Sequence, residues 1–169
     1  MTRTLSRLIA GLPLAVWLTG PTLAQEASSW SVFQDTGPVE CFAVSAPTSQ
    51  ENTRDGQPVQ AVRSETRLFV FYRPGEGVSG QVAFTGGYAF AQDSRVTLEV
   101  GGKPFALFTE GEWAWPANPE VDAQIVEALR GASEVVLTGQ SGRGTVTRDT
   151  FSLEGFLPSL EEAQRLCAS

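Results

Sequence analysis

The 169-residue chain contains no histidine. Without an imidazole, neither a Ser-His-Asp nor a Cys-His catalytic group can form, and zinc sites lose their commonest ligand. This absence excludes most hydrolase chemistry, so we predict no catalytic residues, no metal site and no cofactor. The chain also lacks internal repeats, low-complexity stretches and linkers, and we expect one domain.

No apolar run is long enough for a membrane-spanning helix, which needs roughly 20 residues. The longest run, residues 8–18, follows Arg3 and Arg7 and precedes the short segment Pro-Thr-Leu-Ala at 21–24. A basic start, a short apolar stretch and small residues before a cleavage point are typical of a secretory signal peptide. We therefore predict a signal peptide over residues 1–24 and no transmembrane segment in the mature chain.

Basic residues are scarce, because 12 Lys and Arg stand against 19 Asp and Glu, a net charge of −7. Two arginines and no acidic residue lie in the predicted signal peptide, so the mature chain over 25–169 would carry 10 minus 19, or −9. Nucleic-acid binding requires clustered Lys and Arg to neutralise phosphates, and we exclude it. Adsorption to anionic lipid is disfavoured for the same reason, and the expected partner is basic or neutral.

Cysteine is also rare, with Cys41 and Cys167 near the two ends of the mature chain. An even number of cysteines in an exported protein predicts a disulfide. The bridge would close a loop of about 125 residues, and the chain-entropy model gives it roughly 4–5 kcal/mol. The alternative is a redox pair or a pair of metal ligands, although the chain has no CxxC motif.

Eight short segments are rich in β-branched and aromatic residues and are separated by Gly, Pro, Asp or Asn, a pattern typical of a β-sandwich. They are residues 29–35, 39–46, 66–73, 78–85, 94–100, 103–109, 133–139 and 144–153. Asp55-Gly56 is a turn signal between two of them. Polar residues on both faces at the start of the last segment indicate an edge strand near Thr145 to Phe151, which could accept a strand from a partner.

Two segments have helical spacing. In the first, Asn118 is a predicted N-cap, and Gly131 is expected to end the helix in a left-handed conformation. The second helix is expected to start with a capping box between Ser159 and Glu162. Its apolar spacing turns Cys167 toward the core, where it can meet the other cysteine.

The segment GEWAWP at residues 111–116 sets two tryptophans one residue apart. In an extended strand Trp113 and Trp115 project to one face, and we predict that this face is core and that Pro116 ends the strand. The alternative is an exposed aromatic platform for a sugar or a peptide.

Two glycine-containing segments offer further candidate binding residues. Gly86-Gly87 predicts a bend beside Tyr88 and Phe90, with structural packing as the simpler interpretation and a ligand groove as the alternative. SGRGT places Arg143 between two glycines at a predicted hairpin tip. That tip is either a turn alone or a site for an anion such as phosphate or carboxylate.

Pairs of carboxylates could in principle hydrolyse glycosides. Glu110 with Glu112, and Asp149 with Glu154, are close enough in the sequence to be considered. Because acidic residues are abundant throughout the chain, we interpret these four as solvated surface.

Several sequence blocks occur in a fixed order: FYRPGEGVSG, FTGGYAF, LFTEGEWAWP, TGQSGRGT and DTFSLEGF, between an early cysteine and a final one. From about Trp30 to Cys167 the chain resembles the invasion-associated locus B family. The resemblance implies an immunoglobulin-like β-sandwich and export to the periplasm or outer envelope. The founding member is tied to host-cell invasion by a pathogenic bacterium, which is a phenotype, and the resemblance brings no catalytic residue.

The sequence thus predicts a mainly β protein, a single immunoglobulin-like β-sandwich with two short helices. We expect a non-enzymatic periplasmic protein, with attachment to the outer membrane or secretion as further addresses, that binds an envelope protein or glycan. The candidate binding residues are Arg143, Trp113, Trp115 and Tyr88. One alternative is a carbohydrate-binding or glycoside-acting domain that uses the tryptophans. Another is a factor that caps exposed strands of outer-membrane proteins through its own edge strand.

Overall fold

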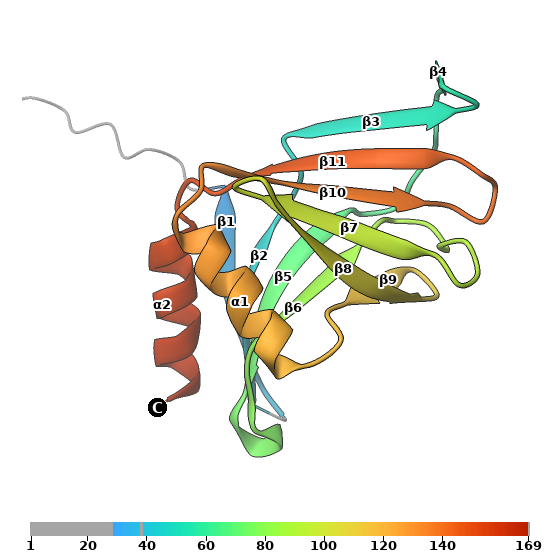
Figure 1. Cartoon of the computed structure of the whole chain (residues 1–169). Helices are drawn as coiled ribbons and strands as arrows, with labels where there is room; N and C mark the ends of the chain where they lie inside the picture. The colour runs from blue at the N-terminus through green and yellow to red at the C-terminus, as the bar shows by residue number, and fades with distance from the viewer. Residues whose placement is uncertain (1–28, 38, 169) are drawn as a thin grey trace, which may run out of the picture.

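The computed structural model describes residues 29–37 and 39–168, so the predicted signal peptide lies outside the described residues. The described chain is mainly β, with eleven strands and two α-helices (Figure 1), which confirms the predicted fold class. The strands are β1 (Trp30–Thr36), β2 (Val39–Ser45), β3 (Ser49–Arg54), β4 (Gln57–Pro58), β5 (Arg67–Arg73), β6 (Val78–Thr85), β7 (Arg95–Val100), β8 (Lys103–Glu110), β9 (Trp113–Trp115), β10 (Glu134–Gln140) and β11 (Val146–Ser152). The helices are α1 (Pro119–Arg130) and α2 (Phe156–Cys167), with a short 3-10 helix at Pro74–Glu76.

Hydrogen bonds join these strands into one antiparallel sheet in the order β1-β2-β5-β6-β9-β8-β7-β10-β11-β3-β4. The sheet folds back on itself, because Phe84 on β6 and Phe151 on β11 contact each other at 6.2 Å between ring centroids although four strands separate β6 from β11 in this order. Figure 1 shows the two halves of the sheet turned toward each other. The immunoglobulin-like sandwich stays a prediction, since all the described strands belong to one sheet.

Each of the eight predicted strands forms within two residues of its expected ends. The hairpin of β3 and β4 turns at Asp55 and Gly56, both with positive φ (50° and 74°), as the Asp-Gly signal predicts. The predicted edge strand is wrong, because β11 pairs with β10 on one side and with β3 on the other. The sequence SQENTR of β3 contains no apolar residue, so the pattern of apolar residues did not predict a strand here.

Both helices lie against the sheet and close the core (Figure 1). In α1 the side chain of Asn118 accepts a hydrogen bond from the amide of Val121 at 3.0 Å, so the predicted cap is confirmed. The predicted left-handed conformation of Gly131 at the end of α1 is wrong, because the φ of Gly131 is −101°. Asp122 also faces inward. Its Oδ1 accepts a hydrogen bond from the amide of Val82 at 2.8 Å, and burial raises its pKa to about 6.

The helix α2 begins four residues earlier than the capping box predicts, because the observed N-cap is Gly155 and the predicted one is Ser159. Gly155, with φ of 79°, precedes its first turn, and the amide of Ser159 donates to the carbonyl of Gly155, so Ser159 lies inside the helix. The start is fixed by Phe156, whose buried ring contacts Trp30 edge-to-face at 4.9 Å. Burial of this ring places the first turn earlier, because the free energy gained by burying an aromatic ring exceeds that of one capping hydrogen bond.

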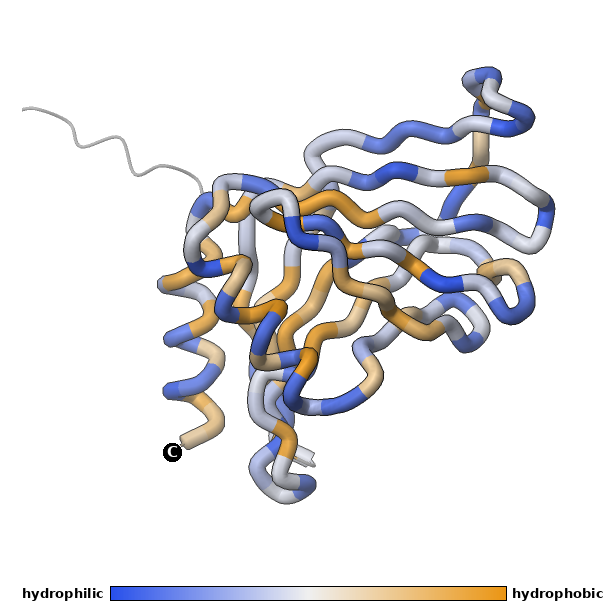
Figure 2. The backbone as a smooth tube through the Cα atoms, in the orientation of Figure 1, coloured by the Kyte–Doolittle hydropathy of each residue, from blue (hydrophilic) through white to orange (hydrophobic). Residues whose placement is uncertain are grey.

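One hydrophobic core joins both halves of the sheet to both helices. Figure 2 shows apolar segments along the inner strands and polar segments along β3. The core-facing side chains of α2, including Leu160, Ala163 and Cys167, are buried as their spacing predicts. Among the described residues, no helix is long and apolar enough to cross a membrane.

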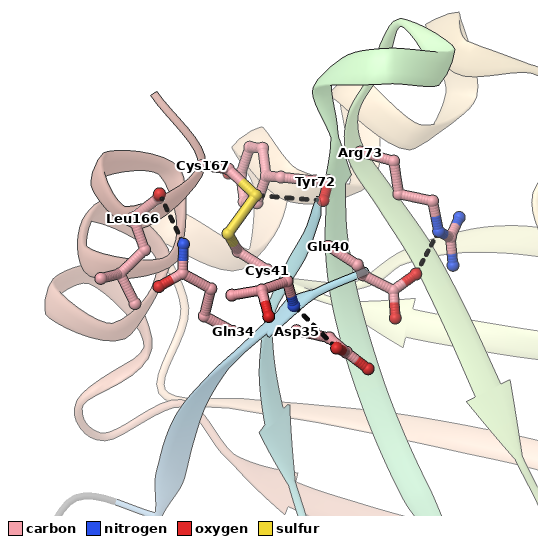
Figure 3. The surroundings of a disulfide bond; sticks show 9 residues. Gln34, Asp35, Glu40, Cys41, Tyr72, Arg73, Leu166 and Cys167 are labelled. Carbon is pink, nitrogen blue, oxygen red and sulfur yellow. Dashed lines mark hydrogen bonds and ion pairs between the residues drawn. A yellow bond between two sulfur atoms is a disulfide. The ribbon is translucent and has the colours of Figure 1, made fainter. Parts of the chain in front are cut away.

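The disulfide between Cys41 and Cys167 is present, with the two Cα atoms 5.7 Å apart (Figure 3). It joins β2 to the end of α2 and confirms the predicted bridge. Nearby, Gln34 Nε2 donates to the carbonyl of Leu166 at 3.1 Å and gives the helix end a second attachment to β1.

Candidate functional site

The strand β9 carries the two tryptophans on its outer face, so the predicted burial of both indoles in the core is wrong. Ala114 is fully buried between them, whereas 36% of Trp113 is exposed. The register gives the reason: Ala114 lies opposite the core residue Phe84 on β6, where a small side chain fits beside the large ring. The indoles of Trp113 and Trp115 stack on the solvent side, 6.1 Å apart with 17° between their planes.

The tryptophans belong to a larger group of seven rings, which we call the aromatic surface. In each successive pair the centroids lie 5.1 to 6.1 Å apart. In order of contact the rings are Phe33 (β1), Phe42 (β2), Phe71 and Phe69 (β5), Trp113 and Trp115 (β9), and Phe108 (β8). The aromatic surface therefore crosses the outer face of half the sheet.

The rings of β5 and β9 meet although β6 lies between these strands. On β6, Ala83 pairs with Phe69 and Thr85 pairs with Trp113. Because both intervening side chains are small, the larger rings lean over them and touch at 5.6 Å, and Ala83 is left 1% exposed. This arrangement requires alternating large and small residues on neighbouring strands.

The rings at the ends of the aromatic surface are the most exposed, with 52% of Phe33 and 42% of Phe108 open to solvent. Near the middle, the guanidinium of Arg73 lies 4.6 Å from the centroid of Phe71 and forms an ion pair with Glu40. The two charges cancel, so the centre of the aromatic surface is close to neutral.

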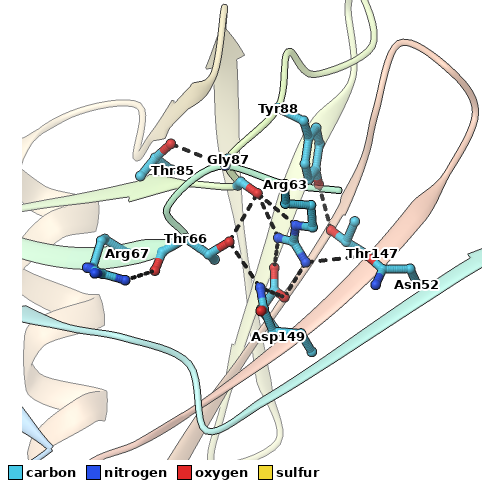
Figure 4. A network of polar contacts seen from close by, with 11 residues as sticks. Asn52, Arg63, Thr66, Arg67, Thr85, Gly87, Tyr88, Thr147 and Asp149 are labelled. Atoms are coloured by element: carbon cyan, nitrogen blue, oxygen red, sulfur yellow. Dashed lines mark hydrogen bonds and ion pairs between the residues drawn. The ribbon is translucent and has the colours of Figure 1, made fainter. Parts of the chain in front are cut away.

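A buried polar network occupies the opposite, inner side of the sheet (Figure 4). Arg63 and Asp149 form a two-pronged ion pair, with Nη1 to Oδ1 and Nη2 to Oδ2 both at 2.7 Å. The side chain of Arg63 is 7% exposed and that of Asp149 is fully buried. Arg63 also donates from Nε and Nη2 to the carbonyl of Gly86, at 2.9 and 2.7 Å, and from Nη1 to Asn52 at 3.5 Å.

These contacts use all five N–H groups of the Arg63 guanidinium. They fix the connection between β4 and β5 against Gly86, which directly follows β6, and against Asp149 on β11. Tyr88 completes the network, because its hydroxyl lies 2.6 Å from Thr147 Oγ1 and its ring centroid lies 5.2 Å from the Arg63 guanidinium carbon. Burial raises the pKa of Tyr88, so its hydroxyl stays protonated at neutral pH.

A cleft of about 650 Å³ opens beside this network. It lies between the β4–β5 connection, the β6–β7 connection and the β10–β11 hairpin, and its lining includes Arg143 and Tyr88. The structure thus brings together two of the four candidate binding residues, while Trp113 and Trp115 belong to the aromatic surface. The neighbour of the tryptophan pair, Glu112, also lines the cleft.

The sequence analysis missed Arg63 and Arg54, both of which line the cleft. No signal near Arg63 could have identified its role, because its partner Asp149 is 86 residues away. The interpretation of Asp149 as solvated surface is wrong, because its side chain is fully buried on the inner face of β11. Its complete burial and its pairing with Arg63 close it to a substrate.

Among residues 29–37 and 39–168, no group of three or more potential metal ligands lies together. Comparisons of the chain with protein-family models, with curated proteins and with solved structures gave no match.

Proposed function

We propose that this protein is an exported, periplasmic or envelope-associated binding protein without catalytic activity, and that it holds another envelope component on its aromatic surface. The signal-peptide pattern, the lack of histidine and the resemblance of the ordered sequence blocks to the invasion-associated locus B family support this proposal. A disulfide between β2 and α2 suits an oxidising compartment.

The observation that carries the proposal is the continuous contact of seven rings on a solvent-facing sheet. Phe33, Phe108 and Trp113 are exposed, while Phe71 in the middle is buried. Exposed apolar side chains that are joined by contact mark interaction sites, whereas singly scattered ones do not. Aromatic side chains are enriched where proteins meet partners, because each buries a large area while ordering few bonds. Here the rings already fix one another by contact, so little side-chain freedom remains to be lost on binding.

A mutant comparison tests the proposal. The protein is crosslinked in intact envelopes and recovered partners are identified by mass spectrometry, for the unmodified chain and for Trp113→Ala. The matched control is Val146→Ala, which alters an apolar side chain of similar exposure, 39%, on β11 and outside the aromatic surface.

We expect one recurring partner with the unmodified chain and with Val146→Ala, and its loss with Trp113→Ala. Equal recovery from all three proteins would contradict binding through the aromatic surface. Turnover of an envelope substrate that is lost on changing Glu110 or Glu112 would contradict the absence of catalysis.

A second candidate is carbohydrate binding at the tryptophan pair. It is favoured by the proximity of Trp113 and Trp115, whose centroids lie 6.1 Å apart and of which Trp113 is 36% exposed, because indole side chains combine a large apolar area with an N–H donor. In this case purified envelope glycans would quench or shift the tryptophan fluorescence, and the change would disappear in Trp113→Ala. A response to proteins alone would favour the first candidate.

A further inference from the structure

We propose that the cleft beneath the β10–β11 hairpin binds the carboxylate of an acidic sugar residue. This site uses other residues than the aromatic surface and does not depend on the proposed function. Its volume, about 650 Å³, falls within the range of small-ligand sites, roughly 300–1,000 Å³.

The floor of the cleft is rigid and carries no free charge. Arg63 lines it, but its charge is balanced by Asp149 and each of its N–H groups already has an acceptor. A ligand therefore gains no direct bond from Arg63. It meets a surface that needs no rearrangement, which lowers the entropic cost of binding.

Two arginines on the walls keep donors for a ligand. Arg54 is exposed and uses one N–H, from Nη2 to Thr145 Oγ1 at 2.7 Å. Arg143 is exposed at the hairpin tip, and among the described residues no hydrogen bond or ion pair engages its side chain. Both residues line the same cleft, and Arg54 contacts the hairpin two residues from Arg143.

The hairpin that carries Arg143 is held in place over the cleft. The amide of Gly142 donates to the carbonyl of Ala89 at 3.0 Å, and the amide of Ala91 donates to the carbonyl of Gln140 at 2.9 Å. These two bonds tie the tip to the connection between β6 and β7. The position of the Arg143 backbone is therefore set by the fold, while its side chain is free to meet a ligand.

The charges of the lining select an anion. Arg54 and Arg143 contribute two positive charges and Glu112 one negative charge, while Arg63 is neutralised. The cleft thus has an excess of one positive charge on a chain with a net charge of −7. Guanidinium groups bind carboxylates through paired N–H···O bonds, which are about twice as strong as neutral hydrogen bonds.

The remaining lining favours a sugar over a peptide terminus. The exposed side-chain amide of Gln60 can exchange hydrogen bonds with ring hydroxyls. The hydroxyl groups of Ser141, Thr145 and Thr147 are buried and already bonded to the Thr145 amide, Arg54 and Tyr88, so they hold the walls of the cleft in place. Glu112 can accept from further hydroxyls, and it repels a carboxylate, which directs that group toward the arginines. Val62 is fully exposed and forms no apolar pocket for a terminal side chain, and the donors are side chains rather than a nest of backbone amides.

Calorimetric titration with glucuronic acid tests the inference, with glucose and a tripeptide with a free C-terminus as comparison ligands. We expect glucuronic acid to bind with a Kd of about 1 mM or tighter and glucose about tenfold more weakly. Arg143→Ala and Arg54→Ala should each weaken glucuronic acid binding about tenfold. The control is Arg148→Ala, which removes an exposed arginine of β11 that does not line the cleft, and it should leave the Kd unchanged.

Thermal melts of every variant establish that it is folded. Equal affinity for glucose, an unchanged Kd in Arg143→Ala, or no binding of glucuronic acid would each overturn the assignment. Tighter binding of the tripeptide with the same dependence on Arg143 would overturn the sugar and assign the cleft to a protein terminus.

Discussion

Removal of the Arg63 guanidinium tests whether the buried ion pair holds the cleft together. In Arg63→Met, the carboxylate of Asp149 loses both 2.7 Å bonds while remaining buried, and the carbonyl of Gly86 loses two of its donors. Breaking one side of a buried pair costs about 3–5 kcal/mol. Because a domain is stable by about 5–15 kcal/mol, this loss is about a fifth or more of the total.

Urea unfolding measures the loss. With a slope of about 2 kcal/mol per molar urea, the midpoint of Arg63→Met should fall by roughly 2 M. Arg148→Met, an exposed change on the same strand as Asp149, should cost less than about 0.5 kcal/mol. The double variant Arg63→Met with Asp149→Leu should recover most of the loss, since no charge is then left buried. A loss below about 1 kcal/mol in Arg63→Met, or a double variant no more stable than the single one, would refute this reasoning.

Three further changes test other parts of the fold. Asp122→Asn keeps a hydrogen-bond acceptor but cannot ionise. Since the folded-state pKa of about 6 lies above the unfolded value of 3.8, the stability of the unmodified protein should fall as the pH rises between these values, by at most about 3 kcal/mol. The variant should show no such fall in melts from pH 4 to 8, and parallel profiles would contradict the assignment. Replacing Cys41 and Cys167 together by alanine should lower the free energy of unfolding by about 2–5 kcal/mol, and a urea midpoint equal to that of the unmodified chain would show that the bridge adds nothing. In Gly87→Ala, with φ of 72°, the new Cβ would lie 2.5 Å from the Ser64 carbonyl oxygen, so a loss above about 2 kcal/mol is expected, and unchanged melting would contradict that close approach.

The two helices could be predicted because local spacing determines which residues share a helical face, and the disulfide because the chain has only two cysteines. The positions of Leu160, Ala163 and Cys167 on one helical face are set by a period of 3.6 residues, whatever the rest of the fold does. Asn118 caps α1 through a bond to a neighbour three residues away. By contrast, β3 has no apolar residue, and its pairing with β11 and β4 makes it a strand.

The site could be predicted only in part. Alternation along β9 shows that Trp113 and Trp115 share a face, but the partner residue Phe84 on β6 decides which face is buried. The seven-ring surface arises from register across strands, and the pairing of Arg63 with Asp149 spans 86 residues. Arg143 at a glycine-flanked tip was recognisable, since that pattern is local.

The central claim is that the aromatic surface holds a partner. Photocrosslinking from a residue within this surface tests the claim most directly. A benzophenone amino acid replaces Phe33, or, in a control chain, Val146 on β11, whose exposure is comparable. Irradiation of intact envelopes should give a defined crosslinked product from position 33 and none from position 146. Crosslinking from position 146 alone, or equal products from both positions, would contradict the claim.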